Sequence, residues 1–182
     1  FGGIFGTGCC PKTELLPVSL DLISIVHIVR PGINGVNAID TARIAISNYG
    51  LTVYHWDWRE NLAKGIYRPN TAYATEACEQ YNWYYSEKIV SIKLSSTRDY
   101  NGTHPAGSSL NDFFDPIDKY GRVTSYDSLV LELNGVFYNT PQPWFYLKDS
   151  TSTQFAHRFV VDYTLDNNEV ISDTTSYVKL LK

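Results

Sequence analysis

Hydrophobic and polar residues alternate with a period of two along much of this 182-residue chain. Because successive side chains of a strand point to opposite faces, this alternation indicates strands with one buried and one exposed face. The longest stripe lies near the C-terminus and has an aromatic or aliphatic side chain at every second position: Phe155, His157, Phe159, Val161, Tyr163 and Leu165. The segment Asp166-Asn167-Asn168 then predicts a turn into further strand over Val170–Leu181.

A similar pattern predicts a strand near the N-terminus. We expect its hydrophobic face to hold Val18, Leu20, Leu22, Val26 and Ile28, with the opposite face formed by Ser19, Asp21 and His27. Turn residues at Pro31-Gly32 and Asn34-Gly35 end this strand. Shorter alternating runs predict three more strands, over Leu51–Trp58 (with Tyr54, Trp56 and Trp58 on one face), Lys88–Ser95 (with Val90, Ile92 and Leu94 inward) and Trp144–Lys148.

A β-hairpin is predicted in the second half of the chain. Leu129, Leu131 and Leu133 alternate with Val130 and Glu132. Asn134-Gly135, which suits a two-residue hairpin turn, follows directly and leads into Val136–Asn139. This pattern predicts two antiparallel strands joined at Asn134-Gly135.

Other segments are less regular. Ala42–Ser47 fits a strand, although Asp40 could instead cap one short helical turn there. Ile66–Ala74 fits an edge strand, because Pro69 cannot donate a hydrogen bond to a neighbour. Thr75–Ser86 is rich in aromatic residues without clean periodicity, and a long loop begins at Ser96, with one helical turn expected around Leu110 and a close at Gly121.

Short strands at this spacing, with almost no helical pattern, predict an all-β protein. The fold we expect is a single Greek-key, immunoglobulin-like β-sandwich over residues 15–182, with one or two short helical turns. Residues 1–14 begin with the glycine-rich FGGIFGTG and are expected to form a flexible tether. The length of the chain fits one domain without internal repeats.

Composition narrows the classes of partner. The formal net charge is −4, and no basic stripe is available to neutralise a phosphate backbone, so we expect no nucleic-acid partner. No window approaches the length of an apolar membrane span. A membrane contact is therefore expected only through a lipid anchor upstream of Phe1. Cys9 itself is a poor lipidation site, because Gly6 stands where leucine is usual.

The three cysteines predict a disulfide bond. Cys9, Cys10 and Cys78 form no CxxC motif and have no histidine pair at zinc-ligand spacing. We expect Cys78 to pair with Cys10 or Cys9. Closing this loop would stabilise the folded state by roughly 4 kcal/mol on the chain-entropy model. Such a bond implies an oxidising compartment. A reactive thiol is the alternative, and one cysteine stays unpaired.

Catalytic and metal-binding motifs are weak. The sequence contains no nucleophile elbow, phosphate-binding loop or zinc-protease motif, and we expect no cofactor. Asp99 and Asn101 resemble the start of a calcium loop, but the position that needs a glutamate holds Leu110. Loop geometry alone explains these residues equally well. Asn101-Gly102-Thr103 is formally an acceptor for N-glycosylation.

Aromatic residues are the more distinctive feature. One cluster comprises Tyr81, Trp83, Tyr84 and Tyr85, a second comprises Tyr54, Trp56 and Trp58, and a third comprises Trp144 and Tyr146. Alternation cannot place all of these rings inside one core. Exposed aromatic rings offer large contact area at low entropic cost, which suits a sugar or protein ligand. The alternative is that the rings pack beneath loops and at sheet ends.

The block Glu87–Phe114 resembles a family of uncharacterised exported lipoproteins of Bacteroidetes, in which a strand of the IVSIKL type leads into a DYN…HPAG…LND loop. The match is carried by Asp99, Tyr100, Asn101, His104, Pro105, Ala106, Gly107, Leu110, Asn111 and Asp112. Cys78 also fits, as a cysteine ahead of that strand. The resemblance implies export, attachment to a membrane through a lipid and a β-sandwich-like fold. It implies no activity.

Three functions follow as hypotheses. The first is a non-enzymatic module of the cell envelope that recognises a glycan or an envelope protein through aromatic loops. Its candidate contact residues are Tyr81, Trp83, Tyr84, Tyr85, Trp56, Trp58 and His104. The second is a hydrolase built on the loop of residues 99–112, which requires a polar group such as Asp112 within hydrogen-bond reach of His104. The third is a purely structural accessory domain.

Overall fold

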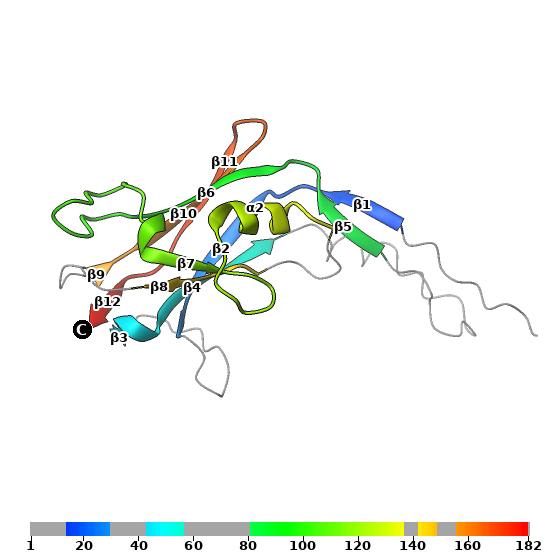
Figure 1. Ribbon diagram of the computed structural model, residues 1–182. Helices are drawn as coiled ribbons and strands as arrows, with labels where there is room; N and C mark the ends of the chain where they lie inside the picture. Colours follow the sequence, from blue (N-terminus) through cyan, green and yellow to red (C-terminus); the bar gives the residue numbers. More distant parts are fainter. Residues whose placement is uncertain (1–13, 30–42, 57–80, 137–141, 149–155, 182) are drawn as a thin grey trace, which may run out of the picture.

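The computed structural model describes residues 14–29, 43–56, 81–136, 142–148 and 156–181. These residues form mainly strands, with one α-helix and two 3-10 turns (Figure 1). In chain order the elements are β1 (Glu14–Val18), β2 (Leu22–Val29), β3 (Arg43–Ala45), η1 (Ile46–Asn48), β4 (Tyr49–Trp56), β5 (Tyr81–Tyr85), β6 (Ile89–Ser96), η2 (Asn111–Phe113), β7 (Phe114–Ile117), α2 (Tyr126–Leu133), β8 (Trp144–Leu147), β9 (Ala156–His157), β10 (Phe159–Leu165), β11 (Val170–Thr174) and β12 (Val178–Leu181).

Two antiparallel sheets make the body of the protein. One has the strand order β2-β4-β8-β7 and the other has the order β11-β10-β6. They meet along β2 and β11, where the backbone N–H of Ile25 donates to Asp173 Oδ2 at 2.8 Å. The described chain is therefore mostly β, as the alternation predicts.

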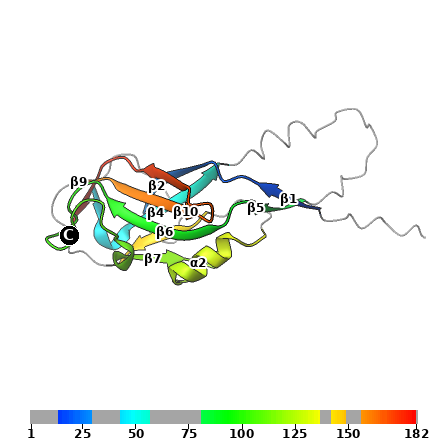
Figure 2. The same cartoon turned by 90° about the horizontal axis from the view of Figure 1, so that it is seen from above.

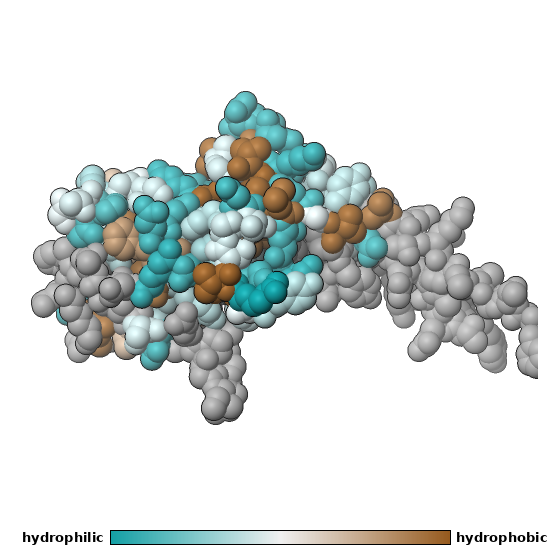
Figure 3. Space-filling model, viewed as in Figure 1, coloured by the Kyte–Doolittle hydropathy of each residue, from teal (hydrophilic) through white to brown (hydrophobic). Residues whose placement is uncertain are grey.

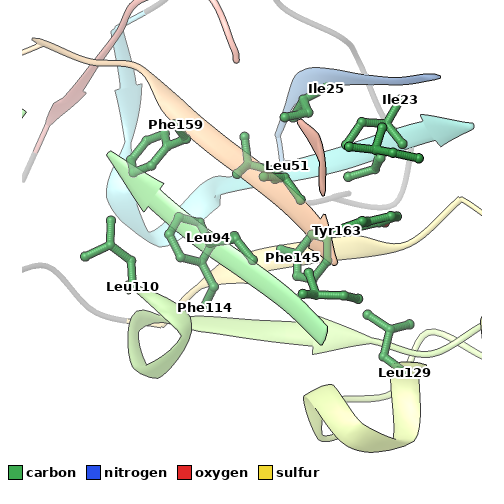
Figure 4. Packing of buried hydrophobic residues seen from close by; sticks show 14 of the residues in the cluster. Ile23, Ile25, Leu51, Leu94, Leu110, Phe114, Leu129, Phe145, Phe159 and Tyr163 are labelled. Carbon is green, nitrogen blue, oxygen red and sulfur yellow. The ribbon is translucent and has the colours of Figure 1, made fainter. Parts of the chain in front are cut away.

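The core lies between these two sheets. Ile23, Ile25 and Leu51 from one sheet face Leu94, Phe159 and Tyr163 from the other, and all are buried (Figure 4). Helix α2 adds Leu129 and η2 is preceded by the buried Leu110, so both close the side where β6 and β7 lie. A smaller group of buried residues lies apart from this core: Ile28, Ile117 and Tyr146.

Two smaller sheets complete the described fold. Strands β3, β12 and β9 form one of them, and β1 pairs in parallel with β5 to form the other. The pair β1–β5 lies at one end of the molecule, beyond the main sheets (Figures 1 and 2). The loop that follows β6 lies at the opposite end.

The C-terminal stripe is confirmed from His157 to Leu165, whereas its first residue, Phe155, lies outside the described residues. His157, Phe159, Val161, Tyr163 and Leu165 are all buried, and the residues between them are half-buried. Strand β10 is paired on both sides, with β6 and β11, and its inner face packs into the core between the two main sheets. The expected turn after it is also present, and Asn168 adopts the left-handed conformation with φ of 66° that asparagine tolerates.

The expected face of the first strand is wrong at Leu22 and at His27, whereas Ile28 is buried as expected, in the smaller group with Ile117 and Tyr146. The chain leaves β1 at Val18 and enters β2 at Leu22, and this break shifts the alternation by one residue. Leu22 is 54% exposed, whereas Ile23, Ile25 and His27 are buried. They lie opposite His55, Val53 and Leu51 of β4, and these six residues form the inner face of the two strands.

Val90 is also on the wrong face. We expected it inward with Ile92 and Leu94, but it is 53% exposed, and Ile89 is buried in its place. The pairing of β6 with β10 contains a bulge at Thr164/Leu165, where Leu165 faces Ile89 while Thr164 faces Ser91. The extra residue in β6 reverses the alternation at this point, as β-bulges do.

The predicted hairpin over residues 129–139 is wrong, because residues 126–133 form helix α2. Ser125 caps the helix by accepting a hydrogen bond from the backbone N–H of Ser128. Leu129 and Leu133 are four residues apart and both buried, whereas Leu131 between them is 74% exposed. The pattern of three leucines thus matched a strand only by coincidence.

Some of the remaining predictions fall on residues that the structure describes, and the others fall outside them. The helical turn around Leu110 is confirmed as η2, and Ala42–Ser47 contains both a short strand and a short turn, β3 and η1. Other predicted features lie outside the described residues: the segments Pro31–Gly35 and Ile66–Ala74, the second strand of the hairpin, most of the tether (1–13), Trp58, and the cysteines Cys9, Cys10 and Cys78.

Candidate ligand-binding surface

The aromatic residues of β5 divide between two faces of the β1–β5 pair. Tyr85 is buried and Trp83 is half-buried against the core, whereas Tyr84 is 37% exposed. The register places Tyr84 directly beside Pro17 and Asn82 beside Leu15, so these four residues share the outer face. Leu15 is 55% exposed and Pro17 is exposed as well. We call Leu15, Pro17, Asn82 and Tyr84 the β5 face.

The inner side of β5 is fixed by hydrogen bonds. The Tyr85 hydroxyl lies 2.6 Å from His55 Nδ1, and the other ring nitrogen, His55 Nε2, lies 3.2 Å from the Tyr163 hydroxyl. All three side chains are buried. Just after the strand, the backbone N–H of Ser86 donates to Val18 O at 2.9 Å. Tyr84 therefore projects from a strand whose neighbouring residue is held in the core.

The electrostatics of this group favour uncharged tyrosines. Burial, followed by the proximity of Tyr85, raises the pKa of Tyr163 well above its ordinary value. A neutral imidazole has one donor and one acceptor nitrogen, so His55 can satisfy one tyrosine as donor and the other as acceptor. The Tyr163 hydroxyl therefore stays protonated, and this hydrogen-bonded group holds β5 against the core.

The other predicted aromatic residues are only partly placed. Trp56 and Tyr81 lie in β4 and β5, but their side chains are outside the described part of the protein, as is all of Trp58. Tyr54 is 37% exposed on the outer face of β4, near the exposed Leu22 of β2. The hydrophobic groups at the β1–β5 end appear in brown in Figure 3.

The loop of residues 99–112 is held by its own polar groups. Asn101 Oδ1 accepts hydrogen bonds from the backbone N–H groups of Thr103 and His104, at 3.0 and 2.9 Å. Asp99 Oδ1 accepts from the backbone N–H of Ala106 at 2.8 Å. Tyr100 is fully buried and anchors the loop to the core. The carboxyl and amide oxygens that suggested a calcium site therefore hold the loop in shape.

His104 is also engaged within this loop. Its Nδ1 lies 2.9 Å from both Asn101 Oδ1 and Thr103 Oγ1, and its ring packs edge-on against Phe113 with centroids 4.8 Å apart. No hydrogen bond joins His104 to Asp112 in the described structure. The acid–base pair that the hydrolase interpretation requires is thus not formed between these two residues. The described residues also contain no group of three or more histidine, cysteine, aspartate or glutamate side chains placed to hold a metal.

Sequence reasoning missed a group of cationic side chains around one tyrosine. The guanidinium carbons of Arg98 and Arg158 lie over the ring of Tyr177, at 5.6 and 5.4 Å from its centroid. The three residues come from three separate segments of the chain. No spacing in the sequence could have brought them together before the strand pairing was known.

Comparisons with protein-family models, with curated proteins and with solved structures find no match to this chain. None of the described helices has the length and apolar character needed to cross a membrane.

Proposed function

We propose that this protein is a non-enzymatic binding module and that the β5 face contacts its ligand. The observation that carries the proposal is the exposed Tyr84 on a strand whose next residue, Tyr85, is fastened to the core through His55. Because the strand that carries this ring is already ordered, binding through Tyr84 costs little backbone conformational entropy. Such rings are frequent among the residues that dominate binding energy.

A protein is the better candidate for the ligand than a glycan. The β5 face places the aliphatic Leu15 and Pro17 beside Tyr84. These side chains add hydrophobic contact area but no hydrogen-bond donors for sugar hydroxyls, so the polar groups of this face are limited to the Asn82 amide and the Tyr84 hydroxyl. Hydrophobic contact with a polar rim is typical of protein interfaces.

The proposal also includes the Greek-key topology of the fold and the location of the protein in the cell envelope. Two antiparallel sheets packed on one core support a Greek-key, immunoglobulin-like β-sandwich. The resemblance of Glu87–Phe114 to exported lipoproteins of Bacteroidetes supports export, lipid attachment upstream of Phe1 and a place in the cell envelope. Fractionation of the producing cells would test this location, and a cytoplasmic protein would contradict it.

A photo-crosslinking experiment tests the contact surface. A photoreactive phenylalanine analogue would replace Tyr84 in the producing cell, and a matched variant would carry it at Tyr120, which is 69% exposed near α2. We expect a discrete protein adduct from position 84 and none from position 120. The same adducts from both positions, or none from position 84, would contradict the proposal.

A second arm separates protein from glycan ligands. Once the adduct is identified, the Tyr84→Ser variant should bind that partner roughly 30-fold more weakly, which corresponds to about 2 kcal/mol for loss of a central aromatic contact. Retardation of the protein in polysaccharide-containing gels, abolished by Tyr84→Ser, would instead identify a glycan as the ligand.

A further inference from the structure

The group around Tyr177 is built from β12 and two neighbouring segments. Val178 pairs with His157, and continuing this antiparallel register places Tyr177 across from Arg158. The backbone N–H of Thr97 donates to Arg158 O at 3.0 Å, which brings Arg98 to the same place. Tyr177 is 49% exposed and Arg98 is exposed as well, so the group faces solvent.

Neither arginine is neutralised by a carboxylate in the described structure. Arg158 Nε donates to Thr175 O at 3.0 Å, which leaves the outer guanidinium nitrogens directed elsewhere. The nearest acidic residue in sequence, Asp99, uses Oδ1 to bind the backbone of its own loop. Two cations therefore contact one ring, without a carboxylate partner among the described residues, on a protein whose formal net charge is −4.

A second group of the same kind shows the usual arrangement. Lys119 Nζ and the guanidinium carbon of Arg122 lie 5.2 and 4.9 Å from the ring centroid of the exposed Tyr120. Here Arg122 forms a salt bridge with Asp118 at 2.8 Å, so the positive charge is compensated internally. The group at Tyr177 has the same geometry but lacks this compensation.

We propose that Arg98, Arg158 and Tyr177 form a docking site for an acidic side chain on a protein partner. Two guanidinium groups that contact one ring present several N–H donors to a carboxylate that approaches it, and planar guanidinium groups match carboxylates well. The Tyr177 ring positions both guanidinium groups through cation–π contacts. The site lies at the opposite end of β6 from the β5 face, so it is a second and independent contact surface.

The net charge argues for isolated carboxylates and against a polyanion. A protein with net charge −4 repels a densely charged polysaccharide or nucleic acid as a whole, because repulsion acts over roughly a Debye length of 10 Å. One or two carboxylates approaching a local pair of arginines avoid most of that repulsion. The favoured occupant is therefore a short acidic segment of a protein.

Binding of a model peptide tests the site. The probe is a tetraglutamate peptide with both ends blocked, and the matched control is the same peptide made of glutamine. Titrations of the intact protein would be followed by NMR at about 0.01 M and 0.15 M ionic strength. We expect the glutamate peptide to shift the signals of Tyr177 and to bind at least about tenfold more weakly to the Arg98→Gln/Arg158→Gln variant. We also expect weaker binding at the higher ionic strength.

The Arg122→Gln variant is the control for unspecific attraction. It removes one positive charge from the other group but is expected to leave peptide affinity within about twofold, because Arg122 is already paired with Asp118. An equal loss for Arg122→Gln, or equal binding of the glutamine peptide, would overturn the proposal. So would an oligomer of galacturonic acid that binds this site more tightly than the peptide, since the occupant would then be a glycan.

Discussion

Asn111 hydrogen-bonds to Leu94 as a neighbouring strand would. Its Oδ1 accepts from the backbone N–H of Leu94 at 2.8 Å, and its Nδ2 donates to Ile92 O at 2.8 Å. Asn134 makes the same kind of pair with both backbone groups of Ile89, at 2.9 and 2.7 Å. Together with the backbone N–H groups of Leu110 and Gly107, which donate to Leu94 O and Ser96 O, these two side-chain amides cover the outer edge of β6 in place of a strand. This protects an edge that could otherwise pair with another chain.

Replacing Asn111 with alanine should destabilise the protein by about 1–3 kcal/mol, because the backbone groups of Ile92 and Leu94 lose their partners. Urea-induced unfolding would measure this change. Asp112→Asn is the matched control next to it, since Asp112 is exposed, and its effect should stay within about 0.5 kcal/mol. Equal stability of the two variants would show that the amide of Asn111 does not hold this edge.

Removing the Tyr85 hydroxyl should loosen β5. Tyr85→Phe deletes the hydrogen bond to the buried His55 Nδ1, at a cost of about 1–3 kcal/mol. Amide hydrogen exchange in β1 and β5 should accelerate together, because the two strands pair only with each other in the described structure. Tyr84→Phe removes a hydroxyl from the exposed neighbour and should change neither measurement.

Alkaline pH should destabilise the protein more steeply than its exposed tyrosines would suggest. Burial is the main cause that raises the pKa of three tyrosines: Tyr49, Tyr126 and Tyr163. A smaller contribution comes from Tyr100 for Tyr49 and from Tyr85 for Tyr163. For Tyr126, the smaller contributions come from Asp115 and Asp112. Above about pH 10 these tyrosines ionise in the unfolded chain but not in the folded one. The unfolded state then binds fewer protons, so each such tyrosine lowers the free energy of unfolding by about 1.4 kcal/mol per pH unit.

The matched variants Tyr126→Phe and Tyr120→Phe test this expectation. Tyr126→Phe should reduce the slope of unfolding free energy against pH above pH 10 by about 1.4 kcal/mol per unit. Tyr120→Phe is the control, because Tyr120 is 69% exposed and folding does not bury its side chain, so this substitution should leave the slope unchanged. Tyrosinate absorbance would show whether the buried group stays protonated until unfolding, and its early ionisation would contradict the argument.

Gly50 should not accept a side chain. A Cβ atom at this position would lie 2.5 Å from Tyr146 Cδ1 and 2.9 Å from Phe145 O, because the Tyr146 ring of β8 covers Gly50 of β4. Gly50→Ala should cost at least about 1–3 kcal/mol through overpacking. Gly102→Ala is the control, since a Cβ there meets no atom within 4 Å. Thermal unfolding of the two variants would compare them, and a stable Gly50→Ala protein would show that β8 can move.

The β10 stripe was predictable because a strand paired on both sides and buried on one face obeys a period of two without interruption. Leu129 and Leu133 were not, because two residues four apart fit the spacing of a helix as well as that of a strand. Only the cap at Ser125 and the exposure of Leu131 distinguish the two structures, and the second is invisible in a sequence. Bulges and strand breaks, as at Val90 and Leu22, likewise depend on the partner strand.

The candidate surfaces were predictable to different degrees. The aromatic cluster from Tyr81 to Tyr85 was evident from composition, but the side each ring faces was fixed only by the pairing of β5 with β1. The arginine pair at Tyr177 had no sequence signal at all, because its members meet through the register of β12 and the loop after β6. The alternation of hydrophobic and polar residues does not indicate which distant segments come into contact.

Strand β6 connects the two proposed contact surfaces, since β5 precedes its first residue and Arg98 follows its last. Eight extended residues span about 26 Å. With one edge bonded to β10 and the other covered by Asn111 and Asn134, this strand resists bending. The module would therefore act as a spacer of fixed length: two sites on one partner that match this distance would bind with avidity, and two separate partners would be held that far apart.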